Sequence, residues 1–177
     1  GDTNDAGDIF MKNLATGVIT RVSTSDLAGE ANGFSQLPVF SADGTRLAFQ
    51  SHASNLVAGD ANHVTDTFVK DLATGTVVRA STNASGGEGD ESSRWFHAFS
   101  PDGTGGQGNG SSYNPVFSPD GTKVAFYSYA SNLVAGDTNG TQDAFVKDLA
   151  TGGITRLSTT ATGGEGNGSS FSPIFSP

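Results

Sequence analysis

Acidic and amide side chains recur in three similar loops of this 177-residue chain, and they are the residues best suited to metal chemistry. In each loop an Asp and an Asn stand two residues apart, and a second Asp follows the Asn after four residues. Calcium in proteins binds about six to eight oxygen atoms from carboxylates, amides, backbone carbonyls and water. The pattern therefore predicts calcium sites at Asp2, Asn4 and Asp8, at Asp60, Asn62 and Asp66, and at Asp137, Asn139 and Asp143.

These loops also have a purely structural interpretation. Asp and Asn side chains accept hydrogen bonds from the backbone two residues further on, and such Asx turns can cap a strand without any metal. Relative to a full Asp-x-Asn-x-Asn-Gly-x-x-Asp loop one carboxylate is absent, so backbone or water would have to complete the coordination. At the bend, Gly140 of the third loop is replaced by His63 in the second and by Asp5 in the first. Calcium binding and Asx turns both remain open at this stage.

The other polar motifs predict no catalytic residue and no organic cofactor. The three histidines, His52, His63 and His97, occupy non-equivalent positions and have no Ser-His-Asp or metal-ligand spacing, and no Gly-x-Ser-x-Gly motif occurs. The Gly-rich loops around Glu88 and Glu165 lack the helix and the Lys of a phosphate-binding loop. We expect these loops to be flexible connections, with the alternative that the two glutamates contribute to a ligand site.

Composition excludes several classes of partner. The chain contains 9 Lys and Arg against 18 Asp and Glu, with a net charge of −9, so it lacks the basic face of a nucleic-acid binder. No apolar run reaches the roughly 18 residues that span a bilayer, which predicts no membrane insertion. The absence of Cys excludes disulfides and thiol catalysis. The chain also begins abruptly inside a repeat, which we interpret as a mature product or a fragment.

The repeats show which elements would position the acidic loops. The loops recur after 58 residues and then after 77 residues, which divides the chain approximately into repeats 2–59, 60–136 and 137–177. Four short strand candidates occur per repeat, separated by turn residues such as Asp43-Gly44 and Asp120-Gly121. The candidates are a Pro-Val-Phe-Ser type at 38–41 and 115–118, a second type at 46–51 and 123–128, the Phe-x-Lys segments at 10–12, 68–70 and 145–147, and strands ending in Arg21, Arg79 and Arg156.

Four antiparallel strands per repeat are typical of a propeller blade. The sequence therefore predicts an all-β fold, a β-propeller of four-stranded antiparallel blades that forms a partial or fragmentary ring. An irregular β-sandwich is the alternative, but the near-identical repeats argue against it. We expect five aromatic side chains to be buried between the strands, namely Phe10, Phe49, Phe68, Phe126 and Phe145.

The longer second repeat contains an apparent 40-residue deletion near Thr104, where a turn of the first type runs directly into a Gly-rich loop. Either three strands were lost by recombination, or a stretch is missing from the sequence. The strand candidate 96–100 would then have no partners, which makes self-association through incomplete blades possible. The nearby Trp95-Phe96-His97 segment departs from the repeat, as a packing variant or as an aromatic contact for a glycan or protein.

Two motifs carry a family resemblance. The Ser-Pro-Asp-Gly turn followed by residues 123–128 resembles the WD40-like β-propeller repeats of the TolB type. Residues 130–140 with 143–148 look like the long repeats of large bacterial secreted and surface proteins. The resemblance covers essentially the whole chain and implies a propeller. In that family the Asp-x-Asn loop is often taken to bind calcium, and TolB-like propellers more generally bind proteins.

Together these observations predict a calcium-binding structural, adhesive or protein-interaction module that is extracellular or at the cell surface, with a protein or glycan partner. One alternative is a TolB-like, partner-binding propeller in the periplasm. Another is a fragment of a propeller-containing hydrolase or lyase, whose catalytic residues would lie elsewhere. The repeats are too alike to single out one catalytic blade, so we do not expect an enzyme.

Overall fold

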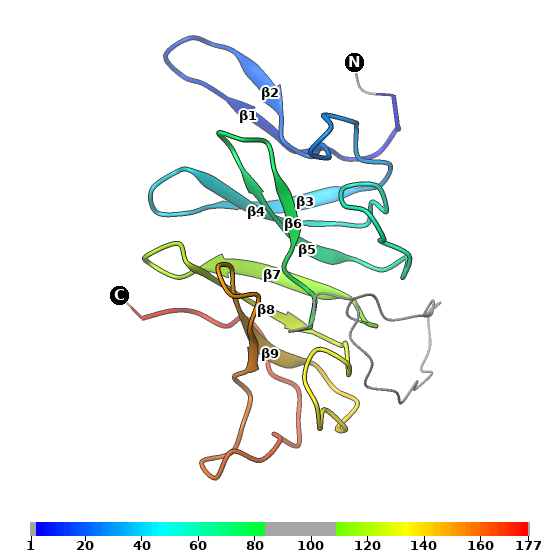
Figure 1. Ribbon diagram of the computed structural model, residues 1–177, viewed down its shortest axis with the longest axis vertical. Coiled ribbons are helices and arrows are strands. Elements are labelled where there is room, and N and C mark those ends of the chain that lie inside the picture. Colours follow the sequence, from blue (N-terminus) through cyan, green and yellow to red (C-terminus); the bar gives the residue numbers. More distant parts are fainter. Residues whose placement is uncertain (1–2, 84–108, 177) are drawn as a thin grey trace.

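The computed structural model describes residues 3–83 and 109–176, and every regular element in them is a β-strand. Three antiparallel sheets follow one another along the long axis of the molecule (Figure 1). The described residues include no helix with the length and apolar character needed to cross a membrane. The strands are β1 (Phe10–Lys12) and β2 (Ile19–Arg21) in the first sheet, β3 (Ser35–Phe40), β4 (Arg46–Ser51), β5 (Asp66–Asp71) and β6 (Val77–Arg79) in the second, and β7 (Ser112–Phe117), β8 (Lys123–Ser128), β9 (Asp143–Asp148) and β10 (Ile154–Arg156) in the third.

The second and third sheets are simple meanders, because each strand pairs with the next one in the chain. This is the four-stranded antiparallel arrangement of a propeller blade, as the repeats predict. The described residues form an open stack of such sheets and no closed ring. Each four-stranded sheet combines the end of one sequence repeat with the beginning of the next, since the repeats were counted from the acidic loops.

The strand bounds follow from local sequence. β4 and β8 coincide with the predicted strands 46–51 and 123–128. β3 and β7 begin three residues before the predicted segments, because each continues through a bulge where the pairing register shifts. Leu37 and Asn114 lie in these bulges with a φ of 52° each. The bulge precedes a proline, whose missing N–H a regular ladder would not tolerate.

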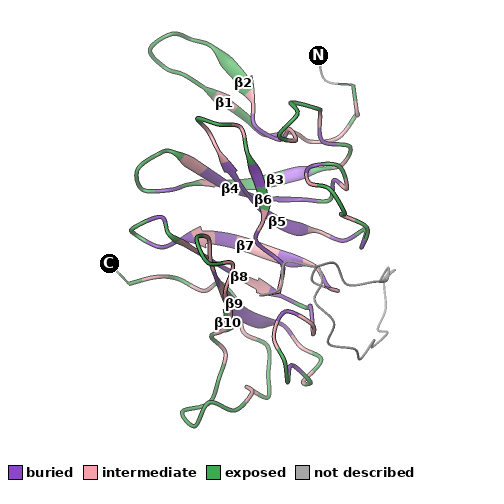
Figure 2. Cartoon of the chain, viewed as in Figure 1, coloured by how far each residue is buried: buried purple, intermediate pink, exposed green. Residues whose placement is uncertain are grey.

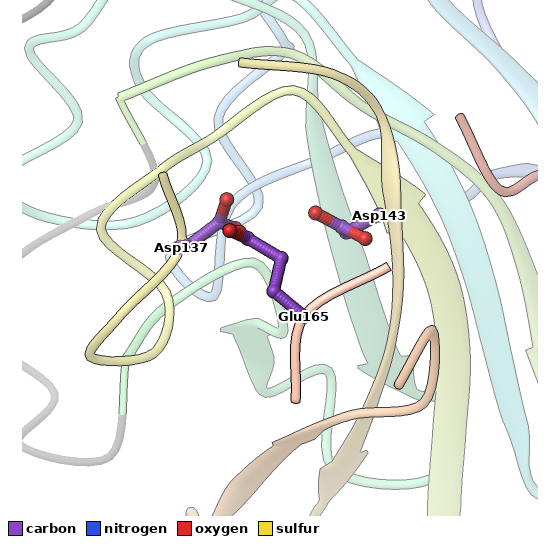
Figure 3. A group of neighbouring side chains, drawn as sticks. All are labelled: Asp137, Asp143 and Glu165. Atoms are coloured by element: carbon purple, nitrogen blue, oxygen red, sulfur yellow. The ribbon is translucent and has the colours of Figure 1, made fainter. Parts of the chain in front are cut away.

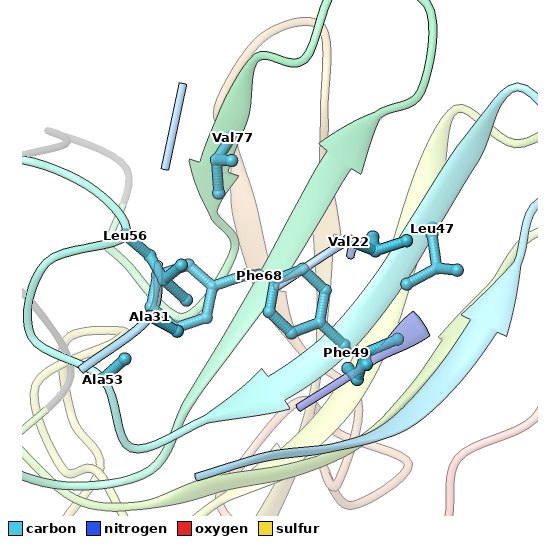
Figure 4. Close-up of a cluster of buried hydrophobic side chains, with 9 residues drawn as sticks. Val22, Ala31, Leu47, Phe49, Ala53, Leu56, Phe68 and Val77 are labelled. Atoms are coloured by element: carbon cyan, nitrogen blue, oxygen red, sulfur yellow. The ribbon is translucent and has the colours of Figure 1, made fainter. Parts of the chain in front are cut away.

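Buried aromatic pairs form the centre of each blade. Phe49 stacks on Phe68 with ring centroids 5.8 Å apart, and Phe126 stacks on Phe145 at 6.0 Å. All four side chains are 0% exposed, which confirms their prediction as core residues. Figure 4 shows the first pair within its cluster. The prediction was wrong for Phe10, which is 52% exposed, because among the described residues β1 pairs only with β2 and no strand equivalent to β4 lies beside it.

Consecutive sheets pack face to face through equivalent residues. Phe68 and Val77 of the second sheet share a cluster with Val22, which follows β2. Phe145 of the third sheet shares a cluster with Val69 and Ala80 of the second sheet in the same way. Buried residues accordingly concentrate in the second and third sheets, whereas the strands of the first are largely exposed (Figure 2).

Several sequence predictions fall outside the described residues. They are the calcium ligand Asp2, the loop glutamate Glu88, the segment Trp95-Phe96-His97, the strand candidate 96–100 and the apparent deletion near Thr104. The two explanations of the deletion therefore both stand as predictions.

Candidate functional site

Three acidic side chains converge beside the third sheet. Asp137 lies in the loop before β9, Asp143 is the first residue of β9, and Glu165 lies in the loop after β10. One carboxylate oxygen from each lies within 4.8 Å of the other two (Figure 3). Asp143 is fully buried and Asp137 is 9% exposed. Two of the three residues are predicted calcium ligands, and we name the three together the acidic cluster.

The start of β9 is held in place through Asp143. One of its carboxylate oxygens accepts a hydrogen bond from the Ser158 hydroxyl, just beyond β10. The other accepts a hydrogen bond from the Asn139 side-chain amide at 2.9 Å. Asp66 accepts the equivalent bond from the Ser81 hydroxyl at 2.6 Å. These aspartates therefore tie the first residue of one strand to the end of its neighbour.

The asparagines of all three loops form Asx turns. The side-chain oxygen of Asn139 accepts a hydrogen bond from the backbone N–H of Thr141 at 2.8 Å. Asn62 and Asn4 accept the same bond at 3.1 and 2.7 Å from the residues two positions on. The three asparagines therefore form the Asx turns that the metal-free interpretation of these loops predicts. Calcium ligation by their side-chain oxygens remains a prediction.

Glu165 closes the cluster by bonding the loop before β9. Its carboxylate accepts hydrogen bonds from the backbone N–H of Thr138 at 2.7 Å, from the Thr138 hydroxyl at 2.8 Å and from the N–H of Asn139 at 3.1 Å. Glu30 bonds Thr3 in the same way in the first repeat. Sequence reasoning gave Glu165 only a minor part and missed Glu30. The available signal was the shared spacing of 27 residues from the bonded threonine to the glutamate.

An arginine supplies the positive charge of the cluster. Arg156, the last residue of β10, places Nη1 2.8 Å from Glu165 and 3.7 Å from Asp137, and its side chain is 10% exposed. Sequence reasoning used this arginine only to mark the end of a strand. The repeated position of the arginine could have indicated an ion pair with the loop, because Arg21 and Arg79 end the equivalent strands and also pair with acidic residues of their loops.

The surroundings of the three carboxyls differ in their electrostatics. Burial, followed by the nearby charge of Asp143, raises the pKa of Asp137 to about 7, and Arg156 only partly opposes this. Burial would also raise the pKa of Glu165, but its hydrogen bonds from Thr138 and Asn139 and the charge of Arg156 together lower it. Asp137 therefore binds a proton at a much higher pH than an ordinary aspartate does. A bound cation could take the place of that proton.

The first and second loops are less complete within the described residues. Asp8 accepts a hydrogen bond from Ser23 at 2.6 Å and lies 3.3 Å from Arg21. In the second loop Asp60 lies 3.4 Å from Arg79. His63 lies at the bend of that loop with a φ of 55°, in the place of a glycine. Neither loop gathers three described acidic side chains of the kind seen around Asp137.

No protein-family model matches the sequence, and no curated protein is significantly similar to it. Among solved structures, TolB from Agrobacterium tumefaciens is similar with 19% identity and a TM-score of 0.47, over 92% of this chain and 45% of that one. The tricorn protease is similar with 18% identity and a TM-score of 0.44, over 82% of this chain and 12% of that one. The chain thus spans less than half the length of either protein, and at such distant similarity its function has to be argued from its own residues.

Proposed function

We propose that this chain is a calcium-binding interaction module built from propeller blades, with the acidic cluster of Asp137, Asp143 and Glu165 as its metal site. The observation that carries the proposal is the convergence of three carboxylates within 4.8 Å of one another. Calcium lies about 2.3–2.6 Å from its oxygen ligands, so ligands of one ion are at most about 5 Å apart. The spacing of the three carboxylates is compatible with a single ion between them.

Charge supports the same assignment. The cluster brings together three carboxyl groups and one guanidinium, and Asp137 responds by a pKa raised to about 7. A divalent cation would displace the proton of Asp137 and relieve its repulsion with Asp143. Arg156 is the competing cation, because it already pairs with Glu165 at 2.8 Å. In the first loop Arg21 contacts two acidic residues, Asp8 and Glu30, whereas three carboxylates converge in the third loop, which makes the third loop the stronger candidate among the described residues.

Calcium should raise the melting temperature of the chain, since a ligand that binds only the native state stabilises it. At a free concentration 100 times the dissociation constant this amounts to about 2.7 kcal/mol. We expect Asp137→Asn to abolish most of the response. Asp120→Asn is the matched control, because Asp120 lies in the β7–β8 turn at the opposite end of the same sheet and should leave the response unchanged. Identical melting curves of the parent chain in calcium and in chelator would contradict the proposal.

The competing role of Arg156 can be tested separately. If its guanidinium occupies the place of a metal, Arg156→Gln should lower stability in chelator and increase calcium affinity, because a positive charge is removed beside Asp137 and Glu165. Isothermal titration with calcium measures the second effect. If Arg156 only stabilises the fold, Arg156→Gln will lower the stability, and neither the parent chain nor the variant will bind calcium.

The interaction role is supported by exposed apolar side chains on the first two sheets. Phe10 and Ile19 are 52% and 62% exposed, and Phe40 on β3 is 51% exposed. Exposed apolar side chains of this size are available for contact with another protein. We keep an extracellular or cell-surface location as part of the proposal, because weak oxygen sites with dissociation constants of about 10⁻⁴–10⁻³ M are used in extracellular modules. A partner-binding role in the periplasm is the alternative.

A further inference from the structure

All three tyrosines of the chain meet on the third sheet. Tyr113 of β7 pairs with Tyr127 of β8, and their ring centroids are 5.5 Å apart with the ring planes tilted by 32°. Tyr129 follows β8, and its ring stands at 83° to that of Tyr113 with the centroids 6.5 Å apart. Tyr129 is 55% exposed, whereas the other two are half-buried. We name these three residues together the tyrosine surface.

The fold of a blade does not require aromatic side chains at these positions. In the second sheet the same positions are occupied by Gln36, Gln50 and His52, and the amides of the two glutamines form a hydrogen bond at 3.3 Å. The two sheets are otherwise closely equivalent, because each has a stacked phenylalanine pair and a bulge before a proline. The structural repeat therefore does not account for the tyrosines.

The exposure of the tyrosine surface is a property of its position in the blade. Parts of the chain lie on both sides of it, since the second sheet packs against the third and the ring of Phe171 meets that of Tyr127 edge-on at 6.1 Å. His52 takes the position of Tyr129 in the second sheet and is also exposed, although the third sheet follows it. Exposure at this position therefore does not depend on whether a further sheet follows.

The end of the sheets that carries the tyrosine surface is acidic. The described loops 22–34, 52–65, 129–142 and 157–169 all lie at this end, because the even-numbered strands finish here. Each of these loops contains at least one Asp or Glu, and none contains Lys or Arg. The arginines that end three of the strands are already paired with these acids. Together with the net charge of −9, this distribution attracts a positively charged ligand.

Tyrosine side chains are suited to such a ligand. The face of an aromatic ring attracts a cation within about 6 Å of its centroid, and the flat guanidinium of arginine also stacks on the ring. Among the described residues, the three tyrosine hydroxyls have no hydrogen-bond partner, so they can accept bonds from a ligand. Burial, followed by the neighbouring Tyr113 and Tyr129, raises the pKa of Tyr127, which places the three phenol groups near one another.

We propose that the tyrosine surface binds arginine side chains of a basic partner protein. The inference rests on the proposed interaction role and names the chemistry of the partner. The rings provide the stacking contact, and tyrosine is among the residues that contribute most to binding energy at protein interfaces. The acidic loops around the rings increase the rate of encounter with a basic partner and disfavour acidic ones.

Fluorescence anisotropy of a labelled peptide of alternating Arg and Ser, titrated with the 177-residue chain, tests the proposal. We expect Tyr129→Ala to weaken binding about fivefold and Tyr129→Phe to retain it, because the ring stacks on the guanidinium. His52→Ala is the matched control, because His52 is exposed at the equivalent position of the second sheet, and it should leave binding unchanged. Absence of binding, or equal weakening by Tyr129→Ala and His52→Ala, would overturn the proposal.

Two further ligands separate arginine stacking from other kinds of recognition. The same peptide with Lys in place of Arg should bind more weakly, and equal binding of the two peptides would show that charge alone is recognised. A neutral glucose oligosaccharide that binds the parent chain but not Tyr129→Ala, while the arginine peptide does not bind, would assign the surface to a glycan. Either result would overturn the proposal.

Repeating the titrations in calcium and in chelator separates this inference from the metal site. Binding of the arginine peptide without any effect of calcium on the melting temperature would remove the metal site and leave the tyrosine surface. A calcium effect on the melting temperature without peptide binding would overturn the role of the tyrosine surface alone.

Discussion

The carboxyl of Asp137 has surroundings that oppose its charge, while its neighbour Glu165 has surroundings that favour it. Burial and the charge of Asp143 raise the pKa of Asp137 to about 7. Glu165 accepts two backbone N–H groups and a hydroxyl, and its pKa lies below the ordinary value. The two groups differ because Glu165 receives donors from the loop, whereas burial is the largest influence on Asp137.

This assignment predicts how the stability of the metal-free chain depends on pH. The pKa of Asp137 is 3.8 in the absence of interactions and about 7 in the fold, so the folded state binds more protons between these values. Its contribution to the free energy of unfolding therefore falls as pH rises through that window and stays low above pH 7. We expect Asp137→Asn, which cannot ionise, to lose this decline in urea unfolding measured in chelator at pH 5 and pH 7.5.

The comparison of the parent chain with Asp137→Asn separates the contribution of the Asp137 carboxyl from that of the other carboxyl groups. Asp43 and Asp120 have a pKa lowered to about 2, first by the hydroxyls of Ser41 and Ser118, and they act in the opposite direction at lower pH. Their contribution is lost as pH falls below about 4. An identical change in stability from pH 5 to pH 7.5 in parent and variant would contradict the raised pKa of Asp137.

At the scale of the elements, the burial of each stacked aromatic pair requires both middle strands of a four-stranded sheet. Phe126→Ala removes a fully buried ring stacked on Phe145, and we expect a loss of about 3–5 kcal/mol in the free energy of unfolding. Phe10→Ala at the equivalent of Phe145 should cost less than about 1 kcal/mol, because that ring is 52% exposed. Chemical denaturation of the two variants measures the difference, and equal losses would contradict the exposed position of Phe10.

Gly33 and Gly110 permit the chain that enters a four-stranded sheet to lie close to the segment that follows its second strand. A Cβ on Gly33 would lie 2.8 Å from the carbonyl oxygen of His52 and 2.9 Å from the N–H nitrogen of Ala53. Gly168 takes the same place after the third sheet, but nothing lies within 4 Å of its Cβ position. We expect Gly33→Ala to destabilise the fold by about 1–3 kcal/mol and Gly168→Ala to be nearly neutral in thermal unfolding. A neutral Gly33→Ala would show that the loop does not pack in this way.

On the scale of the whole molecule, the sheets form a stack in which each contacts its neighbours along the chain. Stability in such an array depends on the interfaces as well as on the units. Lys147 crosses one interface with three hydrogen bonds, to both oxygens of Thr82 and to the carbonyl of Asn83. Its burial lowers the pKa of Lys147 to about 8.

Lys147→Met should therefore weaken the contact between the second and third sheets. We expect a loss of about 1.5–3 kcal/mol, the range for hydrogen bonds that involve a charged group. Lys12→Met is the matched control, because Lys12 is exposed at the equivalent position of β1, and it should be close to neutral. Hydrogen exchange of β7 and β8 locates the effect, and unchanged protection there would contradict a role of Lys147 between the sheets.

The sequence by itself determined the repeated strands, their turns and most of the core. Strands 46–51 and 123–128 were predicted with the observed bounds, because alternation and Asp-Gly turns act over a few neighbouring residues. The burial of Phe49 and Phe126 followed from the same pattern. The all-β prediction is confirmed for the described residues, and four-stranded antiparallel sheets are confirmed for the second and third sheets; the first described sheet has two strands, and no ring closes among the described residues.

Only the tertiary structure decided which residues share the site and which faces are covered. Glu165 joins Asp137 because two loops 27 residues apart meet beside β9 and β10, and neither loop specifies that meeting alone. Arg156 enters the cluster through the same meeting. Phe10 has the sequence pattern of Phe145 but is exposed, because burial depends on the neighbouring strand and not on the residue itself.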